Sequence, residues 1–326
     1  MAAPSQPHQA TYEAIVIGAG IQGSFAAYHL AQRHRDTLLL EQFILPHSRG
    51  SSHGQSRITR SAYPRAPYAR MMPDSFRLWQ RLEAEGRSTS QASPVPPCLG
   101  FPQGQRKRGG LRGERARGEL TWLAGFPGLR LHAGEVAVWD GTGGVLFADR
   151  ALRAVQDVFR RHGGTLRDGE KVLHIEPGAV LTITTAAGVY RAPQLIIAAG
   201  AWTGALVAPL GLRLPLQPLR IDVCYWREKE PGSSGAGRAC PCFMALGLSR
   251  APHGIYGLPA LEYPGLVKVC YHHGSPTDPE KRDRDWVPLG APHPDIALLS
   301  SFISSYLPGL EPRPAVVETC LYTVRP

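Results

Sequence analysis

Three glycines near the N-terminus have the spacing of a dinucleotide-binding turn. Gly18, Gly20 and Gly23 form the pattern G-x-G-x-x-G directly after the apolar run at residues 15–17. The first glycine permits a tight turn, the second lets backbone amides approach a pyrophosphate, and the third lets the next helix pack closely on the strand. The amino terminus of that helix adds unpaired N–H groups and a positive dipole end. These residues therefore predict a pyrophosphate site.

A carboxylate stands where such a site binds ribose. Residues 37–40 predict a second strand that ends at Glu41, close to the expected spacing of about 20 residues from the first glycine. This carboxylate can accept hydrogen bonds from both hydroxyls of an adenosine ribose and would repel a 2′-phosphate, so NADP is disfavoured. The competing interpretation is a glycine turn between two ordinary elements. We favour the dinucleotide site because strand, helix and acid occur together.

Hydrophobic periodicity predicts the elements that position this site. Helices are expected at 74–85 and 145–161, and a shorter helix at 296–306. Strands are expected at 171–175, 180–184, 188–191, 195–199, 221–226, 255–258, 266–271 and 315–322. The uncharged span 195–212 is long enough for a membrane helix, but glycines and Pro209 interrupt it, so a strand, a turn and a short helix explain it better.

Composition limits the class of protein. A chain of 326 residues can form two domains with substantial cores. The net charge of +10 suggests acidic partners or ligands without identifying them. The six cysteines show no regular framework and are typical of reduced intracellular thiols. Residues 1–11 contain two prolines and no apolar stretch, so no secretory signal is expected.

Two other kinds of site are disfavoured. The segment 102–118 is rich in arginine but has no interleaved aromatic residue, so a solvated or disordered loop is favoured over a nucleic-acid-binding arm. No metal site is expected, because neither Cys240 and Cys242 nor His272 and His273 have the paired spacings of structural zinc sites.

Several stretches, in a fixed order, narrow the family. They are HSRGSSHGQSRITRSAY at 47–63, GGVLFADRALRA at 143–154, LIIAAGAWT at 195–203, LPLQPLRI at 214–221, IYGLPALEYPGLVKVCYHHG at 255–274 and ETCLYT at 318–323. Together they resemble the sarcosine oxidase and pipecolate oxidase family of FAD amine oxidases. The resemblance covers about 11–85 and 134–323 and fails over most of 87–130.

The resemblance implies a flavin chemistry. FAD would take a hydride equivalent from the carbon beside a secondary amine, in a substrate such as sarcosine, L-pipecolate or L-proline. Water would hydrolyse the resulting imine, and oxygen would re-oxidise the flavin and release hydrogen peroxide. The cofactor supplies the electron chemistry, and the protein positions and polarises it.

The resemblance also implies the residues that contact the cofactor. Cys320 matches the cysteine that forms a thioether to the flavin 8α carbon; a buried strand cysteine is the alternative. His53 and Arg57 match the pair placed against one face of the isoalloxazine; a solvated polar loop is the alternative. The resemblance implies further cofactor contacts besides the glycines and Glu41, namely Gln42, Ser51, Ser52, Val172, Gly200 and Trp202.

On the substrate side, Arg60 matches the arginine that binds the substrate carboxylate, for which a guanidinium fork is suited. Lys268 matches the lysine that activates oxygen, because a nearby cation stabilises superoxide. The alternative is an edge-strand lysine that prevents aggregation. His272 matches a substrate-side histidine and Tyr256 a residue of the pocket entrance.

The expected fold is α/β. A Rossmann-like FAD-binding domain, with a parallel sheet and helices, would combine 11–85 and 146–218. A sheet-rich α+β substrate domain would use 86–145 and 219–326, and residues 1–10 and about 102–118 would be disordered. The resemblance implies a monomer.

The chain ends soon after the last matching stretch. Residues after Thr323 leave the family pattern, and the terminal Arg325-Pro326 is not an S-K-L-like address. We expect a truncated form that lacks a second lysine for the carboxylate and a Gly-rich flavin-contacting segment, so a catalytically silent flavin-binding fragment competes with the oxidase. The family location is peroxisomal, and a cytosolic one stays open.

Overall fold

The protein is described by a computed structural model over residues 8–87, 99–100, 128–135, 140–231, 242–281 and 293–325. The arginine-rich segment 102–118, with its expected disorder, lies outside these ranges. Cys240 lies outside them as well.

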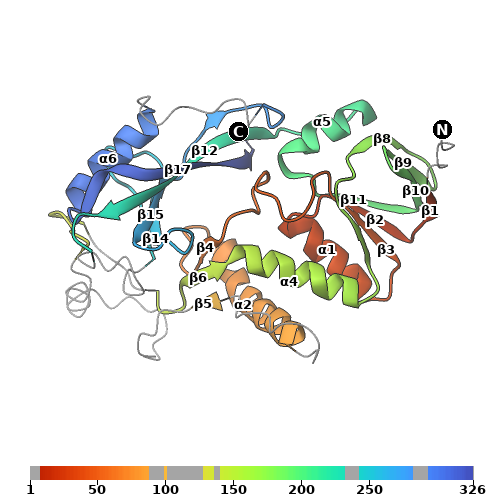
Figure 1. Cartoon of the computed structure of the whole chain (residues 1–326), viewed down its shortest axis with the longest axis horizontal. Coiled ribbons are helices and arrows are strands. Elements are labelled where there is room, and N and C mark those ends of the chain that lie inside the picture. The colour runs from red at the N-terminus through yellow and green to blue at the C-terminus, as the bar shows by residue number, and fades with distance from the viewer. Residues whose placement is uncertain are drawn as a thin grey trace, which may run out of the picture.

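A parallel sheet carries the glycine turn (Figure 1). Its strands run in the order β11, β2, β3, β7, and every pair is parallel. Their bounds are β2 Ala14–Ile17, β3 Thr37–Leu40, β7 Thr165–Arg167 and β11 Gln194–Ile197. Helices α1 (Ile21–Ala31) and α4 (Ala148–Arg161) pack against one face through a buried apolar cluster. The expected Rossmann-like arrangement is confirmed.

A second sheet packs on the other face through a further apolar cluster. Its order is β1, β10, β9, β8, with bounds β1 His8–Thr11, β8 Val172–Glu176, β9 Leu181–Thr185 and β10 Gly188–Ala192. The expectation that residues 1–10 are disordered is wrong for residues 8–10. This segment gains order because β1 pairs in parallel with β10.

The antiparallel sheet at the other end of the molecule contains long strands (Figure 1). It runs β13, β14, β15, β12, β16, and β17 also pairs with β12. The bounds are β12 Gln217–Glu228, β13 Phe243–Ala245, β14 Ile255–Pro259, β15 Leu266–Tyr271, β16 Ser275–Pro276 and β17 Leu310–Val324. Helix α6 (Pro294–Tyr306) covers one face over a buried apolar cluster.

The helix expected at 145–161 is wrong in its first three residues, which belong to a strand of a smaller sheet. Residues Gly144–Phe147 form β6, which lies between β4 (Ser56–Thr59) and β5 (Leu99–Gly100). Helix α4 therefore begins at Ala148, because pairing with a distant strand outweighs the local helical pattern. Helix α2 (Ala66–Arg87) is longer than the expected 74–85 and contains Pro73.

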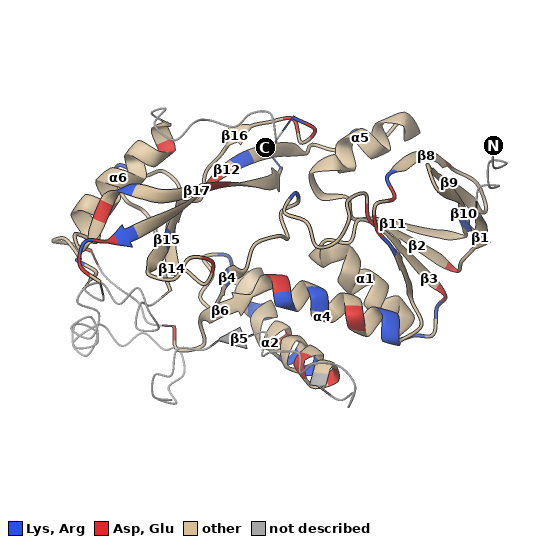
Figure 2. Cartoon of the chain, in the orientation of Figure 1, with Lys and Arg blue, Asp and Glu red and all other residues tan. Residues whose placement is uncertain are grey.

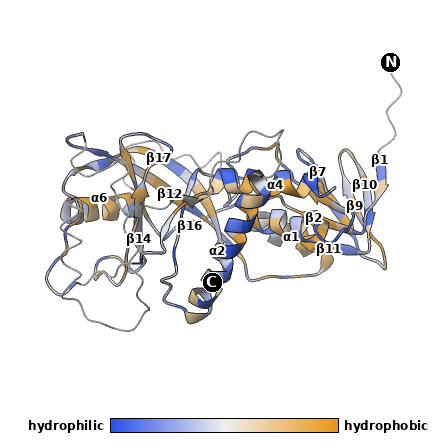
Figure 3. Ribbon diagram, turned by 90° about the horizontal axis from the view of Figure 1, so that it is seen from below, coloured by the Kyte–Doolittle hydropathy of each residue, from blue (hydrophilic) through white to orange (hydrophobic). Residues whose placement is uncertain are grey.

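The outer face of α4 is charged, whereas its inner face belongs to the core. Figure 2 shows acidic and basic residues alternating along it, and Arg153 forms an ion pair with Asp149 at 2.8 Å. Its buried apolar side chains are Ala148, Ala151, Ala154, Val155, Val158 and Phe159. In Figure 3 the strands β2 and β11 carry mainly hydrophobic colours. This amphipathic pattern fixes α4 against α1 below the glycine turn.

The uncharged span after β11 forms the expected turn and short helices. These are η1 (Gly200–Trp202), α5 (Thr203–Val207) and η2 (Ala208–Leu210). Within the described ranges, no helix has the length and apolar character needed to cross a membrane.

Candidate active site

The glycine turn is held so tightly that a side chain would clash at two of its positions. Gly18 has φ +100°, and a Cβ there would lie 2.5 Å from the carbonyl oxygen of Ala198. A Cβ on Gly23 would lie 1.9 Å from the carbonyl oxygen of Gly18. A Cβ on Gly20 would lie 3.1 Å from Ser52 Oγ. The close approach of α1 to the turn thus directs its first amides toward the space above β2.

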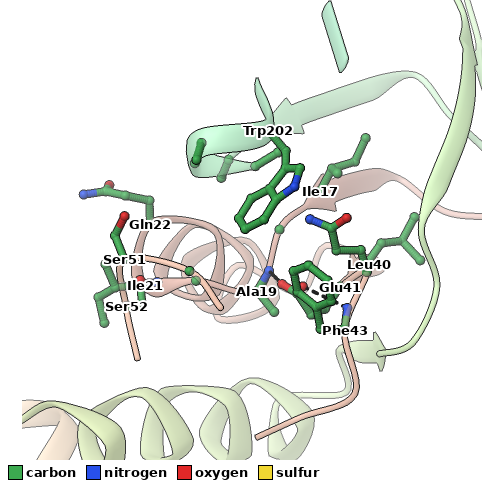
Figure 4. Close-up of a pocket in the computed structure, with 18 of the residues that line it drawn as sticks. Ile17, Ala19, Ile21, Gln22, Leu40, Glu41, Phe43, Ser51, Ser52 and Trp202 are labelled. Atoms are coloured by element: carbon green, nitrogen blue, oxygen red, sulfur yellow. Dashed lines mark hydrogen bonds between the residues drawn. The ribbon is translucent and has the colours of Figure 1, made fainter. Parts of the chain in front are cut away.

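The Glu41 carboxylate lies at the end of β3 and is oriented by backbone amides. Ala19 N donates to Oε2 at 2.8 Å, and Phe43 N donates to Oε1 at 3.1 Å. His47 Nε2 lies 3.5 Å from Oε1. Figure 4 shows the carboxylate beside Ala19 and Phe43. Glu41 is therefore fixed against the glycine turn, where a ribose hydroxyl would meet it.

A cavity of about 1360 Å³ opens above the turn. It is larger than the 300–1,000 Å³ typical of small-ligand sites, so it has room for an extended molecule. Most of the predicted cofactor contacts line it. They are Gly18, Gly20, Glu41, Gln42, Ser51, Ser52, Val172, Gly200 and Trp202, together with His53 and His272. Gly23, Arg57, Lys268 and Cys320 are not in its lining.

The loop after β3 is organised by Arg57. This guanidinium donates to the carbonyl oxygens of Ser51 and Ser56, both at 2.8 Å, and to that of His53 at 2.6 Å. The His53 ring, through Nδ1, contacts the carbonyl oxygen of Gly50. The loop is thus held by internal hydrogen bonds, and it presents His53 to the cavity while Arg57 supports it from behind.

At the far end of the cavity, His272 meets strand β17. Its Nδ1 lies 3.2 Å from the hydroxyl of Tyr322, and the hydroxyls of Tyr322 and Tyr256 are hydrogen-bonded to each other. Burial and the charge of Arg60 lower the pKa of His272. Burial raises the pKa of Tyr256 well above its usual value. At neutral pH this end therefore offers a neutral imidazole and protonated phenols.

Arg60 lines a second cavity, of about 830 Å³, which His272 also lines. Its Nε donates to the carbonyl oxygen of Ala62 at 3.0 Å, and its guanidinium carbon lies 4.3 Å from the centre of the Tyr63 ring. Within the described ranges, its two terminal nitrogens have no hydrogen-bond partner. Arg60 therefore presents an open fork of donors beside His272, which suits a carboxylate.

Lys268 is buried in an ion pair. Its Nζ lies 3.0 Å from Glu262 Oε1 and 3.2 Å from Ser56 Oγ, and the side chains of Lys268 and Glu262 are 5% and 7% exposed. The edge-strand interpretation is wrong, because β15 is hydrogen-bonded to both β14 and β12. Burial alone would raise the pKa of Glu262, but Lys268 and Ser56 outweigh it and lower that pKa.

Cys320 lies on β17 within an apolar cluster and is buried. Its Sγ lies 3.7 Å from the carbonyl oxygen of Leu321. Tyr322, on the same side of the strand, lines the large cavity, as do Thr323 and Val324. The thiol therefore lies on the same face of β17 as a residue of the cavity wall, two residues away along the strand.

Sequence reasoning missed two residues of this region. Glu262 escaped attention although a lysine inside a strand implies a buried acid. Tyr322 carries no local signal of its own, although it lies two residues after Cys320 on the same strand and therefore on the same face. Among the described residues, no group of three or more histidine, cysteine or acidic side chains could hold a metal ion.

Comparison with known proteins decides the family. Residues 13–326 match the model of the FAD dependent oxidoreductase family. Human peroxisomal sarcosine oxidase is 50% identical over 322 residues, which cover 97% of this chain and 82% of that protein. Monomeric sarcosine oxidase of Bacillus sp. (strain B-0618) is 32% identical, over 96% of this chain and 81% of that protein.

The chain belongs to the FAD-dependent oxidoreductase family. Within it, the chain is an amino acid oxidase of the sarcosine oxidase type. Solved structures share the fold. The open form of a Tyr258Phe mutant of the amino acid oxidase NikD aligns with TM-score 0.71 at 22% identity, over 97% of this chain and 82% of that one. L-proline dehydrogenase from P. horikoshii aligns with TM-score 0.69 at 18% identity, over 98% and 83%.

FAD fits the residues that line the large cavity. The Trp202 indole N–H is buried and has no acceptor among the described residues, so it can donate to a ligand. A Cβ on Gly200, at φ +53°, would meet no atom within 4 Å, which leaves open space for a cofactor. Glu41 would hold the ribose, and the amino terminus of α1, where Ile21 N donates to Ser52 Oγ at 3.0 Å, would hold the pyrophosphate.

Substitution of Glu41 should weaken cofactor retention. Glu41→Ala leaves the Ala19 and Phe43 amides without their acceptor and removes the predicted ribose ligand. We expect FAD affinity to fall roughly tenfold or more, because a hydrogen bond to a charged group contributes about 1.5–3 kcal/mol. Equilibrium dialysis in a Cys320→Ser background, where the flavin is free to exchange, measures this. Glu41→Gln, which keeps an amide oxygen, should lose less, and an unchanged affinity in Glu41→Ala would remove Glu41 from the site.

Proposed function

We propose that this chain oxidises small secondary amino acids, namely sarcosine, L-pipecolate and L-proline, to imines with release of hydrogen peroxide. The observation that supports this proposal most is the position of His272, which lines both cavities. Arg60 lines the second cavity, and its terminal nitrogens have no hydrogen-bond partner among the described residues. A secondary amino acid has the matching groups, since its carboxylate suits Arg60 and its amine suits a neutral imidazole. Names of relatives such as sarcosine oxidase support the same substrate class.

Different residues would bind the carboxylate, the amine and the cofactor. Arg60 binds the carboxylate, and this fixes the α-carbon relative to the large cavity. His272 accepts a hydrogen bond from the amine, while the Tyr322 hydroxyl holds the ring in place. Bound in the large cavity, FAD would supply the acceptor for a hydride equivalent from the carbon beside the amine. His53, presented by the loop that Arg57 supports, would line the cofactor on the other side.

Peroxide release tests this proposal. The FAD-loaded chain should release hydrogen peroxide with sarcosine, L-pipecolate and L-proline, and much less with glycine. Arg60→Met should raise KM for sarcosine roughly tenfold to a hundredfold, because a charge-assisted contact to the carboxylate is lost. The exposed Arg70 of α2 provides a control, and Arg70→Met should leave KM unchanged. Absence of peroxide with every secondary amine, despite full flavin loading, would count against the proposal.

We propose that Cys320 forms a thioether to the flavin. Its strand reaches the cavity wall at Tyr322, which lies two residues further along the same face of β17 and lines the large cavity. Denatured protein should therefore keep its flavin, and Cys320→Ser should release it. Cys224, buried in the same sheet, provides a control, and Cys224→Ser should retain flavin. Free flavin from fully loaded, acid-denatured wild type would contradict the attachment.

We propose a peroxisomal location and a monomeric state, as the names of two relatives suggest. Light scattering of the purified chain should give the mass of one copy, 35.4 kDa. Fractionation of expressing cells should place the chain with catalase. A dimer mass, or a wholly cytosolic fraction, would overturn the respective part.

A further inference from the structure

The second cavity is far larger than sarcosine needs. Its walls come from the loop after β4, the first half of α2, and β13 with the residue that follows it. The residues of its wall that matter here are Arg60, Tyr63, Tyr68, Met71, Leu78 and Leu246. Its volume of about 830 Å³ lies in the range of sites for drug-sized ligands. Apart from Arg60, Arg65, Asp74, Ser75 and His272, the residues of its wall are apolar or aromatic.

The apolar wall is exposed rather than packed. Tyr68, Met71, Leu78 and Leu246 are 51%, 63%, 41% and 55% exposed. Large apolar side chains that gather around one concavity mark a ligand groove more often than a chance surface. Tyr63 and Tyr68 add aromatic faces, with ring centres 6.0 Å apart. Such a wall suits an aromatic or branched aliphatic group.

Charge at the cavity favours an anion at one end. The open donor fork of Arg60 and the guanidinium of Arg65 line it. Asp74 also lines it, but its carboxylate contacts Arg77. Because His272 lines both cavities, a carboxylate on Arg60 would place its amine at the junction and its substituent along the apolar wall.

We propose that the second cavity is a subsite for the apolar substituent of the substrate. The preferred class is then a secondary amino acid whose nitrogen or α-carbon carries an aromatic or branched apolar group, rather than sarcosine with its single methyl. This inference rests on the proposed function for its chemistry. The predicted preference for binding an apolar group depends only on the cavity and does not require that the amine is oxidised.

Binding of unreactive carboxylates tests the subsite separately from turnover. Calorimetric titration of the flavin-loaded chain should show 3-phenylpropanoate binding roughly tenfold or more tightly than acetate, because a phenyl ring is buried. Leu246→Asp should abolish this preference and leave acetate binding within about twofold. Leu212→Asp is the matched control, since Leu212 is 52% exposed and lines neither cavity, and it should keep the preference.

Turnover completes the test. N-benzylglycine should have a kcat/KM at least tenfold above that of sarcosine, and Leu246→Asp should reduce that ratio while melting as the wild type does. Equal binding of the two carboxylates, or a preference that survives Leu246→Asp, would overturn the subsite even if sarcosine is oxidised. A preference without oxidation of any amine would support the subsite and defeat the proposed function.

Discussion

Lys268→Met should destabilise the protein more than any other single change to the site. It leaves the Glu262 carboxylate buried, 7% exposed, without its cation. Removing one partner of a buried ion pair costs about 3–5 kcal/mol in the free energy of unfolding. Urea denaturation with and without FAD measures this. A loss below about 1 kcal/mol would show that the pair is not desolvated in solution.

A double variant separates the effect of the lost ion pair on stability from the effect of the lost lysine on flavin re-oxidation. Lys268→Met with Glu262→Gln removes both charges and keeps an amide near Ser56, so most of the stability should return. We propose that Lys268 serves re-oxidation by oxygen, so the double variant should still re-oxidise slowly while its reduction by sarcosine stays closer to wild type. Equal losses in the two half-reactions would indicate a general structural role for the lysine.

The contribution of Glu262 to the pH dependence of stability should have opposite signs in the wild type and in Lys268→Met. In the wild type the pKa of Glu262 is lowered, so its contribution is present above the unfolded value near 4.5 and is lost as pH falls through the folded pKa. In Lys268→Met, burial should raise that pKa above 4.5. The folded state then binds more protons, and this group's contribution falls as pH rises above 4.5. Unfolding curves from about pH 3 to pH 7 measure both slopes, since the wild-type change lies below 4.5. Parallel slopes would contradict the assignment.

Gly23→Ala should eliminate flavin binding. Its Cβ would lie 1.9 Å from the backbone carbonyl oxygen of Gly18, so α1 must move away from the turn. Overpacking of this kind costs about 1–3 kcal/mol of stability, and the amides that would face the pyrophosphate move with the helix. We expect flavin content after purification to fall to a small fraction of the wild-type value.

Gly204 provides a matched control for Gly23. It is also a helical glycine, in α5, but its Cβ would meet no atom within 4 Å. Gly204→Ala should therefore keep full flavin loading, with stability unchanged or raised by up to about 1 kcal/mol. If the two variants load flavin equally, the close contact between α1 and the glycine turn does not control the site.

The features that the sequence predicts are those that depend on residues close together in the chain. Gly18, Gly23 and Glu41 act within one strand–helix–strand unit, so their spacing already contains the geometry. Three strands of the parallel sheet, β2, β3 and β11, and most strands of the antiparallel sheet are predicted because their apolar runs are short and bounded. The fourth strand, β7, is not predicted, because its three residues are ordered by pairing with β3. The limits of β17 are not predicted either, since its first residues, from Leu310, are ordered by pairing with β12 rather than by their own pattern.

Contacts between distant segments could not be read. Ser56 and Glu262, hydrogen-bonded at 2.8 Å, are 206 residues apart, and no local pattern links them. The same holds for the strand β6, because the local pattern predicts a helix from residue 145 and does not reveal the distant partner strand β4. The second cavity is likewise formed by α2 and β13 together, and neither segment predicts it alone.

The most direct test of the account is an anaerobic titration of the flavin-loaded chain with a secondary amino acid. The account predicts that sarcosine, and more readily N-benzylglycine, removes the oxidised-flavin absorbance, and that admitted oxygen restores it with one equivalent of hydrogen peroxide per flavin. Arg60→Met should require much higher substrate concentrations for the same change. Flavin that stays oxidised with every secondary amino acid, in protein that is folded and fully loaded, would contradict the account.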